Sequence, residues 1–106
     1  MSKEPLFTVV AMDIDRTFTA APEAWLKVIV ILRDAGFKPI FVTGRQDTDT
    51  ADFDRIGIPR DSTVFFTNGT PKREYMQSLG LNVSIWIDDD PDSIVGMLTA
   101  SPDNEL

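Results

Sequence analysis

Four apolar segments alternate with helix-like segments along the chain, and this alternation constrains the fold more than any other feature. The segments are residues 6–12, 38–45, 62–69 and 81–89, each rich in β-branched or aromatic residues. When a helix joins one strand to the next, the strands run parallel and the crossover is right-handed. The sequence therefore predicts an α/β fold: a three-layer parallel sheet of about four strands with helices on both faces. One domain is expected over residues 1–106, with a polar tail over about 99–106.

Proline, glycine and capping residues predict where the connecting helices begin and end. In residues 21–36, Pro22 stands where the first turn of a helix tolerates proline, and Gly36 stands where a helix stops. The β-branched residues of this segment also allow a strand, but its polar residues recur at helical spacing and favour the helix. Thr70 and Asp90 are placed to cap two later helices through their side chains. Beyond residue 36 we expect helices over 47–57, 70–80 and 90–98.

The composition narrows the chemistry that this chain can perform. It contains no histidine and no cysteine, which excludes Ser-His-Asp triads, cysteine nucleophiles, phosphohistidine enzymes and ordinary zinc sites. Carboxylates remain, and their oxygen atoms suit hard cations such as Mg²⁺. A net charge of −7 argues against tight nonspecific binding to nucleic acid, so a nucleic acid is expected only as a substrate end.

No segment of the sequence predicts contact with a membrane. The longest apolar run, residues 28–32, is too short to span a bilayer, and no export signal precedes the first apolar segment. We therefore expect no membrane partner and a cytoplasmic location.

Polar residues follow the four apolar segments at the points where the strands are expected to end. They are Asp13, Thr43, Asn68 and Asp88. Because the carboxyl ends of parallel strands meet at one edge of the sheet, these residues are expected to line one crevice. The segment "DIDRT" over residues 13–17 is the sharpest element, since both of its carboxylates can reach that crevice. The same five residues also fit a plain Asx turn capped by Thr17, and this alternative stays open.

Four segments resemble, in order, the four motifs of the haloacid dehalogenase (HAD) superfamily of phosphatases. They are "VVAMDIDRT", "IFVTGR", Lys72 before a strand, and "IWIDD", and the resemblance covers residues 6–98. "TGR" and the later "TNG" are similar to the sugar-phosphate phosphatase branch, whereas "IDDDPDSIV" resembles the phosphatase half of polynucleotide kinases. The resemblance implies a Rossmann-like, HAD-like fold, and the segments between the motifs hold no inserted cap domain.

The resemblance assigns a role to each matching residue. It makes Asp13 the nucleophile that forms an aspartyl phosphate. Asp15 is the acid that protonates the leaving oxygen and the base that then activates water. Thr43 binds a phosphoryl oxygen beside the backbone of Gly44, and Lys72 offsets the negative charge that the phosphoryl group shares with the nucleophile.

The resemblance also implies a Mg²⁺ ion. Its direct ligands are Asp13, Asp88 and the backbone carbonyl of Asp15, while Asp89 acts through metal-bound water or supports the ligands. Arg16 and Arg45 are further expected contacts to the phosphorylated substrate. Arg16 stands where the family commonly has glycine.

These expectations describe a Mg²⁺-dependent phosphomonoester hydrolase with an open, capless site. A nucleotide or the terminal phosphate of a polynucleotide fits as its substrate. Two alternatives stay open: a noncatalytic interaction module on the same sheet, and a phosphoacceptor switch like response-regulator receivers. After the segment over 81–89 we expect only one short helix and the tail, so the family's usual fifth strand is missing and the strand over 81–89 then lies at the sheet edge. We therefore expect a second subunit, forming a homodimer, or the tail to cover its apolar residues.

Overall fold

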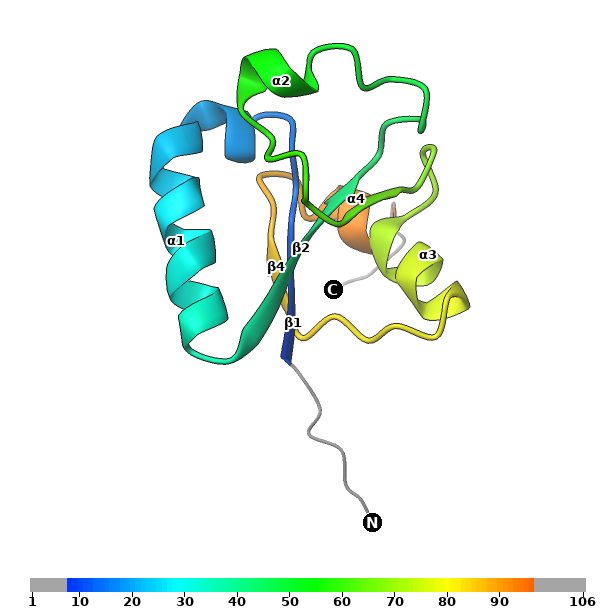
Figure 1. Cartoon of the computed structure of the whole chain (residues 1–106). Helices are drawn as coiled ribbons and strands as arrows, with labels where there is room; N and C mark the ends of the chain where they lie inside the picture. The colour runs from blue at the N-terminus through cyan, green and yellow to red at the C-terminus, as the bar shows by residue number, and fades with distance from the viewer. Residues whose placement is uncertain (1–7, 97–106) are drawn as a thin grey trace.

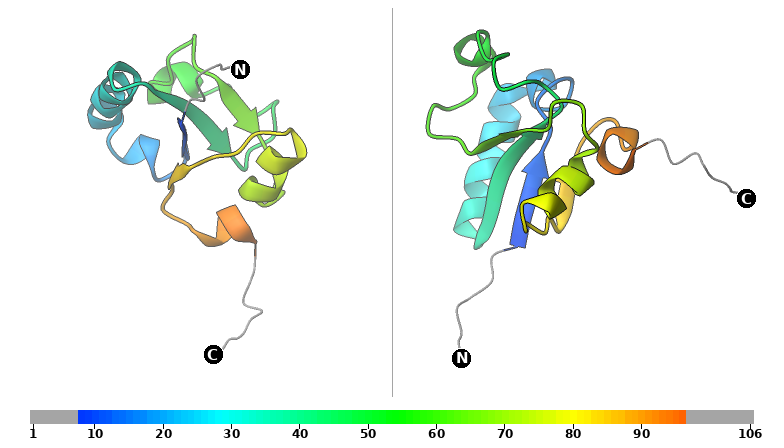
Figure 2. Two further views of the ribbon diagram at one scale, coloured as in Figure 1. Left: turned by 90° about the horizontal axis from the view of Figure 1, so that it is seen from below. Right: turned by 90° about the vertical axis from the view of Figure 1, so that its right-hand side faces the viewer.

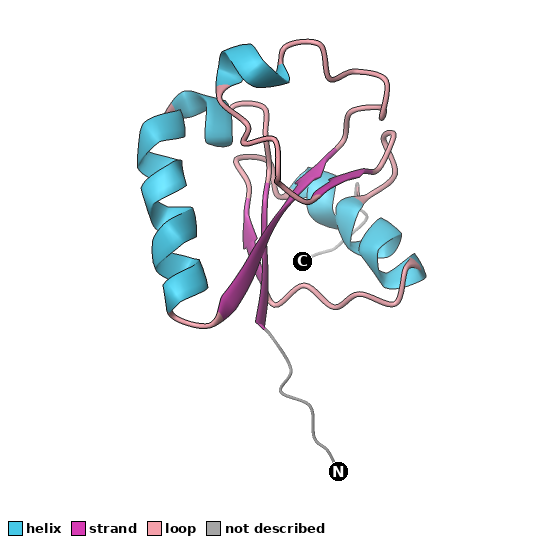
Figure 3. Ribbon diagram, in the orientation of Figure 1, coloured by secondary structure: helices cyan, strands magenta, loops and turns pink. Residues whose placement is uncertain are grey.

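The computed structural model describes residues 8–96, which form four strands, four α-helices and one short 3₁₀ helix (Figure 1; Figure 3). The strands are β1 (Thr8–Met12), β2 (Phe37–Thr43), β3 (Val64–Phe66) and β4 (Ile85–Ile87). The helices are η1 (Phe18–Ala20), α1 (Pro22–Asp34), α2 (Phe53–Ile56), α3 (Lys72–Ser78) and α4 (Asp92–Val95). None of these helices is both long enough and apolar enough to cross a membrane. The expected tail over 99–106 lies outside the described residues.

All four strands run parallel, in the order β3–β2–β1–β4. β1 pairs with β2 on one side and with β4 on the other, so it lies inside the sheet (Figure 2). This arrangement confirms the parallel α/β sheet that the alternating segments predict. Among the described residues β4 is an edge strand, and Ile85 at its start is 43% exposed.

Side chains of the central strands alternate between two apolar clusters. Met12 and Phe41 belong to a cluster that includes Ile29 of α1. Ala11 belongs to a second cluster, which includes Met76 of α3. Because successive residues of a strand point to opposite faces, α1 and α3 pack against different faces of the sheet (Figure 1).

The segment that follows β1 is anchored in the first of these clusters by Phe18. The Phe18 side chain is fully buried, and its ring meets the ring of Phe41 edge-on with 5.2 Å between the centroids. Such an aromatic pair is favourable beyond the area that it buries. The buried Phe18 side chain therefore holds the turn over residues 13–17, which contains Asp13 and Asp15.

α1 begins and ends where proline and glycine predict. Pro22 occupies the first turn of the helix, and the chain leaves the helix through Ala35 and then Gly36, which has a φ of 95°. Glycine suits this left-handed conformation because it lacks a Cβ atom. The helical alternative for this β-branched segment is therefore confirmed.

The expected helix over 47–57 is wrong for its first half, because only α2 (Phe53–Ile56) is helical. Residues 47–52 read "DTDTAD", and Asp and Thr are poor helix formers because their side chains compete for backbone hydrogen bonds. The backbone instead forms a turn, in which the Asp49 N–H donates to the Gln46 carbonyl. The Asp49 carbonyl accepts a hydrogen bond from the Arg45 side chain.

Thr70 and Asp90 do not cap helices, so both capping predictions are wrong. α3 begins at Lys72 and α4 at Asp92, which places Pro71 and Pro91 at the N-cap positions, and neither helix has a side-chain cap. The Pro71 carbonyl accepts the Tyr75 N–H at 3.0 Å and so makes the first turn of α3.

The strands expected over 62–69 and 81–89 are only three residues long in the structure. The outer residues of both segments belong to loops rather than to the sheet.

Candidate active site

Asp13 and Asp88 lie side by side because the register of two parallel strands places them there. Met12, the last residue of β1, is opposite Ile87, the last residue of β4. The Asp13 N–H extends the pairing by one residue, since it donates to the Ile87 carbonyl at 2.9 Å. The next residue of each strand is an aspartate, so two carboxylates emerge from adjacent strand ends.

Lys72 lies between these two carboxylates. Asp13 shares the sheet face of Ala11, which α3 covers, and Lys72 is the first residue of α3. Its Nζ atom donates to Asp13 Oδ1 at 2.8 Å and to Asp88 Oδ2 at 2.6 Å. All three side chains are at least nine-tenths buried. Burial raises the pKa of the Asp13 carboxyl above its usual range, although the hydrogen bond from Lys72 acts in the opposite direction.

Asp89 completes a cluster of three carboxylates, and the hydroxyl of Thr17 lies between Asp89 and Asp13. Thr17 Oγ1 lies 3.3 Å from Asp13 Oδ2 and 3.0 Å from Asp89 Oδ1, and it accepts the Asp89 N–H at 3.0 Å. A hydroxyl has one proton, so it can donate to only one of the two carboxylates. One of the two oxygens, Asp13 Oδ2 or Asp89 Oδ1, therefore receives no hydrogen bond from Thr17.

The three carboxylates fit a divalent cation. One oxygen atom each from Asp13, Asp88 and Asp89 lies within 4.8 Å of the others. Carboxylate oxygens are the ligands that Mg²⁺ prefers, and a dication would neutralise the charge that Lys72 leaves uncompensated. The donor set therefore suits the expected ion.

The carboxylate of Asp15 turns away from this cluster toward Arg45. Arg45 Nη2 donates to Asp15 Oδ1 at 2.7 Å, and Arg45 Nε donates to Asp15 Oδ2 at 3.0 Å. This pair of bonds lowers the pKa of Asp15 below its usual range and holds the side chain as a carboxylate. The expected Mg²⁺ contact of Asp15 is its backbone carbonyl, which the ion pair leaves untouched.

Thr43 ends β2, and Gly44 after it borders a hollow of about 270 Å³. Thr43 is fully buried, and its Oγ1 accepts the Arg45 N–H at 3.2 Å. Gly44 lines the hollow, and a Cβ atom built there would meet nothing within 4 Å. Lys72 and Thr67 also line it, and the buried Thr67 hydroxyl is without a hydrogen-bond partner among the described residues.

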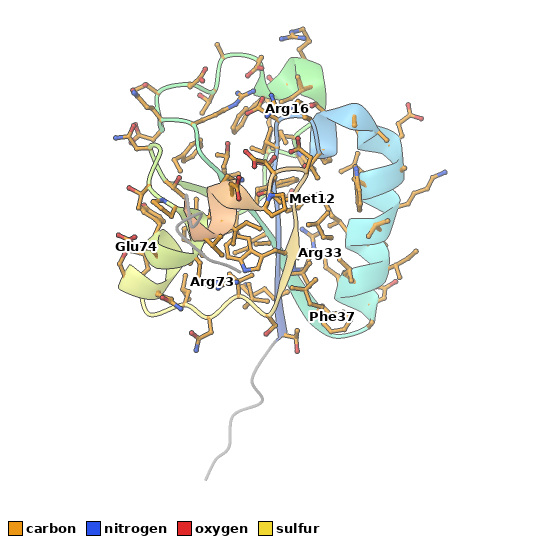
Figure 4. All side chains as sticks on the ribbon, turned by 180° about the vertical axis from the view of Figure 1, so that it is seen from behind. Met12, Arg16, Arg33, Phe37, Arg73 and Glu74 are labelled. Carbon is orange, nitrogen blue, oxygen red and sulfur yellow. The ribbon has the colours of Figure 1, made fainter. Side chains whose placement is uncertain are left out.

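Arg16 lies at the same edge of the molecule, beyond Met12 at the end of β1 (Figure 4). Its side chain is exposed, and its Nε atom donates to Asp89 Oδ2 at 3.1 Å. This contact lowers the pKa of Asp89. The backbone of Arg16 has a φ of 64°, a left-handed conformation that glycine adopts more easily. Glycine would therefore relieve backbone strain at this position.

The sequence-predicted residues meet at the carboxyl edge of the sheet in two connected groups. Asp13, Asp88, Asp89 and Lys72 form one group, and Asp15 and Arg45 form the other. Asn68 lies one position beyond Thr67 in an exposed turn with a φ of 53°, so the buried polar residue after β3 is Thr67.

Four further residues of the edge were not singled out as site residues by the sequence: Thr17, Asp52, Thr67 and Ser93. Ser93 Oγ donates to the Asp90 carbonyl at 2.8 Å and lies 3.3 Å from Asp88 Oδ2. Asp52 pairs with Arg45 at 2.7 Å. The position of Thr17, four residues after Asp13, was visible in the sequence, but it indicated only the cap of a turn. The other three carried no signal, because they become neighbours only through tertiary packing.

Comparison of the chain with protein-family models, with curated proteins and with solved structures finds no match. The geometry of the site and the resemblance of its motifs are therefore the basis for the function proposed below.

The left-handed backbone at position 16 generates a stability prediction. Arg16→Gly and Arg16→Ala both remove the exposed ion pair with Asp89, but only glycine relieves the positive φ. The left-handed conformation costs a residue with a Cβ atom roughly 1–2 kcal/mol. Urea unfolding should therefore give Arg16→Gly a free energy of unfolding about 1 kcal/mol above that of Arg16→Ala.

Lys27 in the exposed face of α1 provides the matched control. At this helical position the order should reverse, because glycine is about 1 kcal/mol less favourable than alanine in a helix. Equal stabilities of the two position-16 variants would contradict the conformational explanation.

Proposed function

We propose that this chain is a Mg²⁺-dependent phosphomonoester hydrolase of the HAD superfamily, with a three-layer HAD-like sheet and an open site without a cap domain. The observation that carries the proposal is the buried carboxylate of Asp13, which Lys72 contacts and which is grouped with Asp88 and Asp89. A carboxylate held at a strand end, beside a cation and a site for a divalent ion, suits a nucleophile for phosphoryl transfer.

The proposed reaction has two displacements at phosphorus. Asp15 first takes up a proton from solvent, since Arg45 otherwise holds it as a carboxylate. In the first displacement, a carboxylate oxygen of Asp13 attacks the phosphorus atom, the bond to the leaving oxygen breaks, and Asp15 gives that oxygen its proton. In the second, water attacks the phosphorus of the aspartyl phosphate and gives a proton to Asp15. The bond from phosphorus to the Asp13 oxygen breaks, and inorganic phosphate leaves.

Lys72 supports this reaction through charge. Its ammonium group has three N–H donors, and the bonds to Asp13 and Asp88 use two of them. The third is available for a phosphoryl oxygen. The hollow beside Lys72 adds the hydroxyl of Thr67, and Gly44 leaves space beside it, so a phosphoryl group there would meet donors from two different segments.

The proposed Mg²⁺ ion would be held by Asp13, Asp88, Asp89 and the backbone carbonyl of Asp15. When bound, it neutralises negative charge on the phosphoryl oxygens. Removal of the ion restores the repulsion among the three carboxylates, which only one buried ammonium then offsets.

The proposed substrate is a phosphomonoester whose leaving group extends into solvent, such as a nucleotide or the terminal phosphate of a polynucleotide. Residues 13–21 between β1 and α1 contain only a turn and the short helix η1. The site therefore has little chain above it on this side, which supports a bulky leaving group.

A homodimer through β4 is a further part of the proposal. Among the described residues β4 pairs only with β1, and Ile85 is exposed, so the strand offers apolar surface at an open edge. Light scattering should give the mass of two chains at micromolar concentration, and Ile85→Lys should shift it to that of one. A wild type that stays monomeric at high concentration would contradict the dimer but not the activity.

The catalytic roles generate a prediction for two aspartates. With Mg²⁺ and an aryl phosphate, Asp13→Asn should lower kcat by at least about 10³-fold, since it removes the nucleophile. Asp15→Asn should lower kcat by about 10²–10⁴-fold because it removes the acid and base. It should also accumulate phosphorylated Asp13, detected as an added phosphoryl group in the mass of the intact protein.

Asp54→Asn is the matched control, because it breaks an exposed aspartate–arginine pair with Arg60 at 2.8 Å and should leave kcat unchanged. Full activity of Asp13→Asn, or equal activity in EDTA and in Mg²⁺, would overturn the hydrolase. A wild type that holds its phosphoryl group without turnover would indicate a phosphoacceptor switch instead.

The metal site generates a prediction for hydrogen exchange. The Asp89 N–H donates to Thr17 and the Asp90 N–H donates to Asp88, so both amides depend on groups of the carboxylate cluster. Chelation with EDTA should raise their exchange rates in a peptide covering 88–92, while a peptide covering 53–60 should not change. Identical exchange of residues 88–92 with and without Mg²⁺ would contradict binding at this cluster.

A further inference from the structure

Every N–H group of the Arg45 side chain is used within the protein. Nε and Nη2 donate to the two carboxylate oxygens of Asp15 at 3.0 and 2.7 Å. Nη1 and Nη2 donate to the two oxygens of Asp52 at 2.7 and 3.1 Å. Nη1 also donates to the Asp49 carbonyl at 3.0 Å. Since a guanidinium has five N–H donors, none is left for a substrate phosphate in this arrangement.

The guanidinium of Arg45 is also enclosed. Its side chain is 12% exposed, and its central carbon lies 5.5 Å from the centre of the Phe53 ring. One edge of the planar group faces Asp15 and another faces Asp52, and each edge makes two parallel hydrogen bonds. Such paired bonds fix the orientation of a carboxylate as well as its distance.

The two carboxylates differ in what surrounds them. The Asp15 side chain is 48% exposed and lies two residues from Asp13, so the lone pairs of its carboxylate that Arg45 does not use are accessible from solvent. Asp52 is 27% exposed and lies immediately before α2, on the neighbouring edge of the guanidinium, and Nη2 donates to both carboxylates. Asp52 therefore fixes the edge of Arg45 next to the one that faces Asp15.

We propose that Arg45 and Asp52 form a positioning clamp for Asp15, the acid and base of the proposed reaction, and that neither contacts the substrate. The clamp rests on the proposed function and extends it to a residue, Asp52, in the loop after β2. Proton transfer requires the carboxylate to lie within hydrogen-bond reach of the leaving oxygen, and a displacement of about 1 Å can cost roughly 10²-fold in rate. A side chain that is half exposed needs such a support, since few packing contacts restrict its rotation.

The experiment compares two phosphate esters that differ in their need for an acid. The p-nitrophenolate ion leaves readily without a proton, whereas the alkoxide from glycerol phosphate requires one. Because water attacks the same aspartyl phosphate with either ester, the phosphorylation of Asp13 is measured alone, in a single turnover. Asp52→Asn and Arg45→Lys should lower the rate constant of this step by about 10–100-fold with glycerol phosphate and by less than about 3-fold with p-nitrophenyl phosphate. The concentration of each ester that gives half of the maximal single-turnover rate should stay within about twofold, because the clamp gives the substrate no hydrogen bond.

Asp52→Glu keeps the charge and should recover most of the activity toward glycerol phosphate. Asp54→Asn, which breaks the exposed pair with Arg60, should change neither ester. Urea unfolding of each variant establishes that the assayed protein is folded.

Three results would overturn the clamp. Equal losses of the phosphorylation rate constant with both esters would indicate that Arg45 and Asp52 only stabilise the fold. A rise in the half-saturating concentration of both esters would indicate that Arg45 binds the substrate directly. A wild type that shows no Mg²⁺-dependent hydrolysis of either ester would contradict both the proposed function and the clamp. The first two results would contradict the clamp alone.

Discussion

The ammonium group of Lys72, buried between Asp13 and Asp88, connects the parts of this molecule on which the site depends. It joins the ends of two adjacent strands, β1 and β4, to the first turn of α3. Burying a charge is costly unless it is paired, and removing one partner of such a group typically costs about 3–5 kcal/mol. The same contact therefore aligns the sheet edge and sets the electrostatics of Asp13, whose carboxylate faces both a cation and two like charges.

The cations of the sheet edge are already engaged by carboxylates. Lys72 contacts Asp13 and Asp88, Arg45 contacts Asp15 and Asp52, and Arg16 contacts Asp89: these are the described pairs. A phosphate arriving at this edge meets cations whose charge is largely neutralised. Within the proposed function, the attraction for an anionic substrate therefore depends on the divalent ion more than on arginine side chains. The sequence motif alone suggests that Arg45 is free to bind an anion, whereas the structure pairs it with Asp15 and Asp52.

Much of the fold and part of the site could be predicted from the sequence because they follow from local patterns. Pro22 and Gly36 delimit α1, and the apolar segments ending at Asp13 and Asp88 delimit strands that share one edge. The Asp and Thr residues over 47–52 already disfavour a helix, but the path of this loop could not be predicted, because it depends on hydrogen bonds to Arg45. α3 and α4 also begin after the residues predicted to cap them. The proline before each helix occupies the N-cap position, and neither helix has a side-chain cap.

The sequence by itself determined the order of strands and helices, the absence of histidine and cysteine chemistry, and the set of residues at the strand ends. Only the tertiary structure decided how those residues pair. Strand register placed Asp13 beside Asp88, and the packing of α3 on that face brought Lys72 between them. The turn after β1 and the loop after β2 determined that Asp15 faces Arg45 while Asp89 faces Thr17. Neighbours in strands and helices follow from backbone periodicity, whereas contacts between distant loops depend on how the whole chain packs.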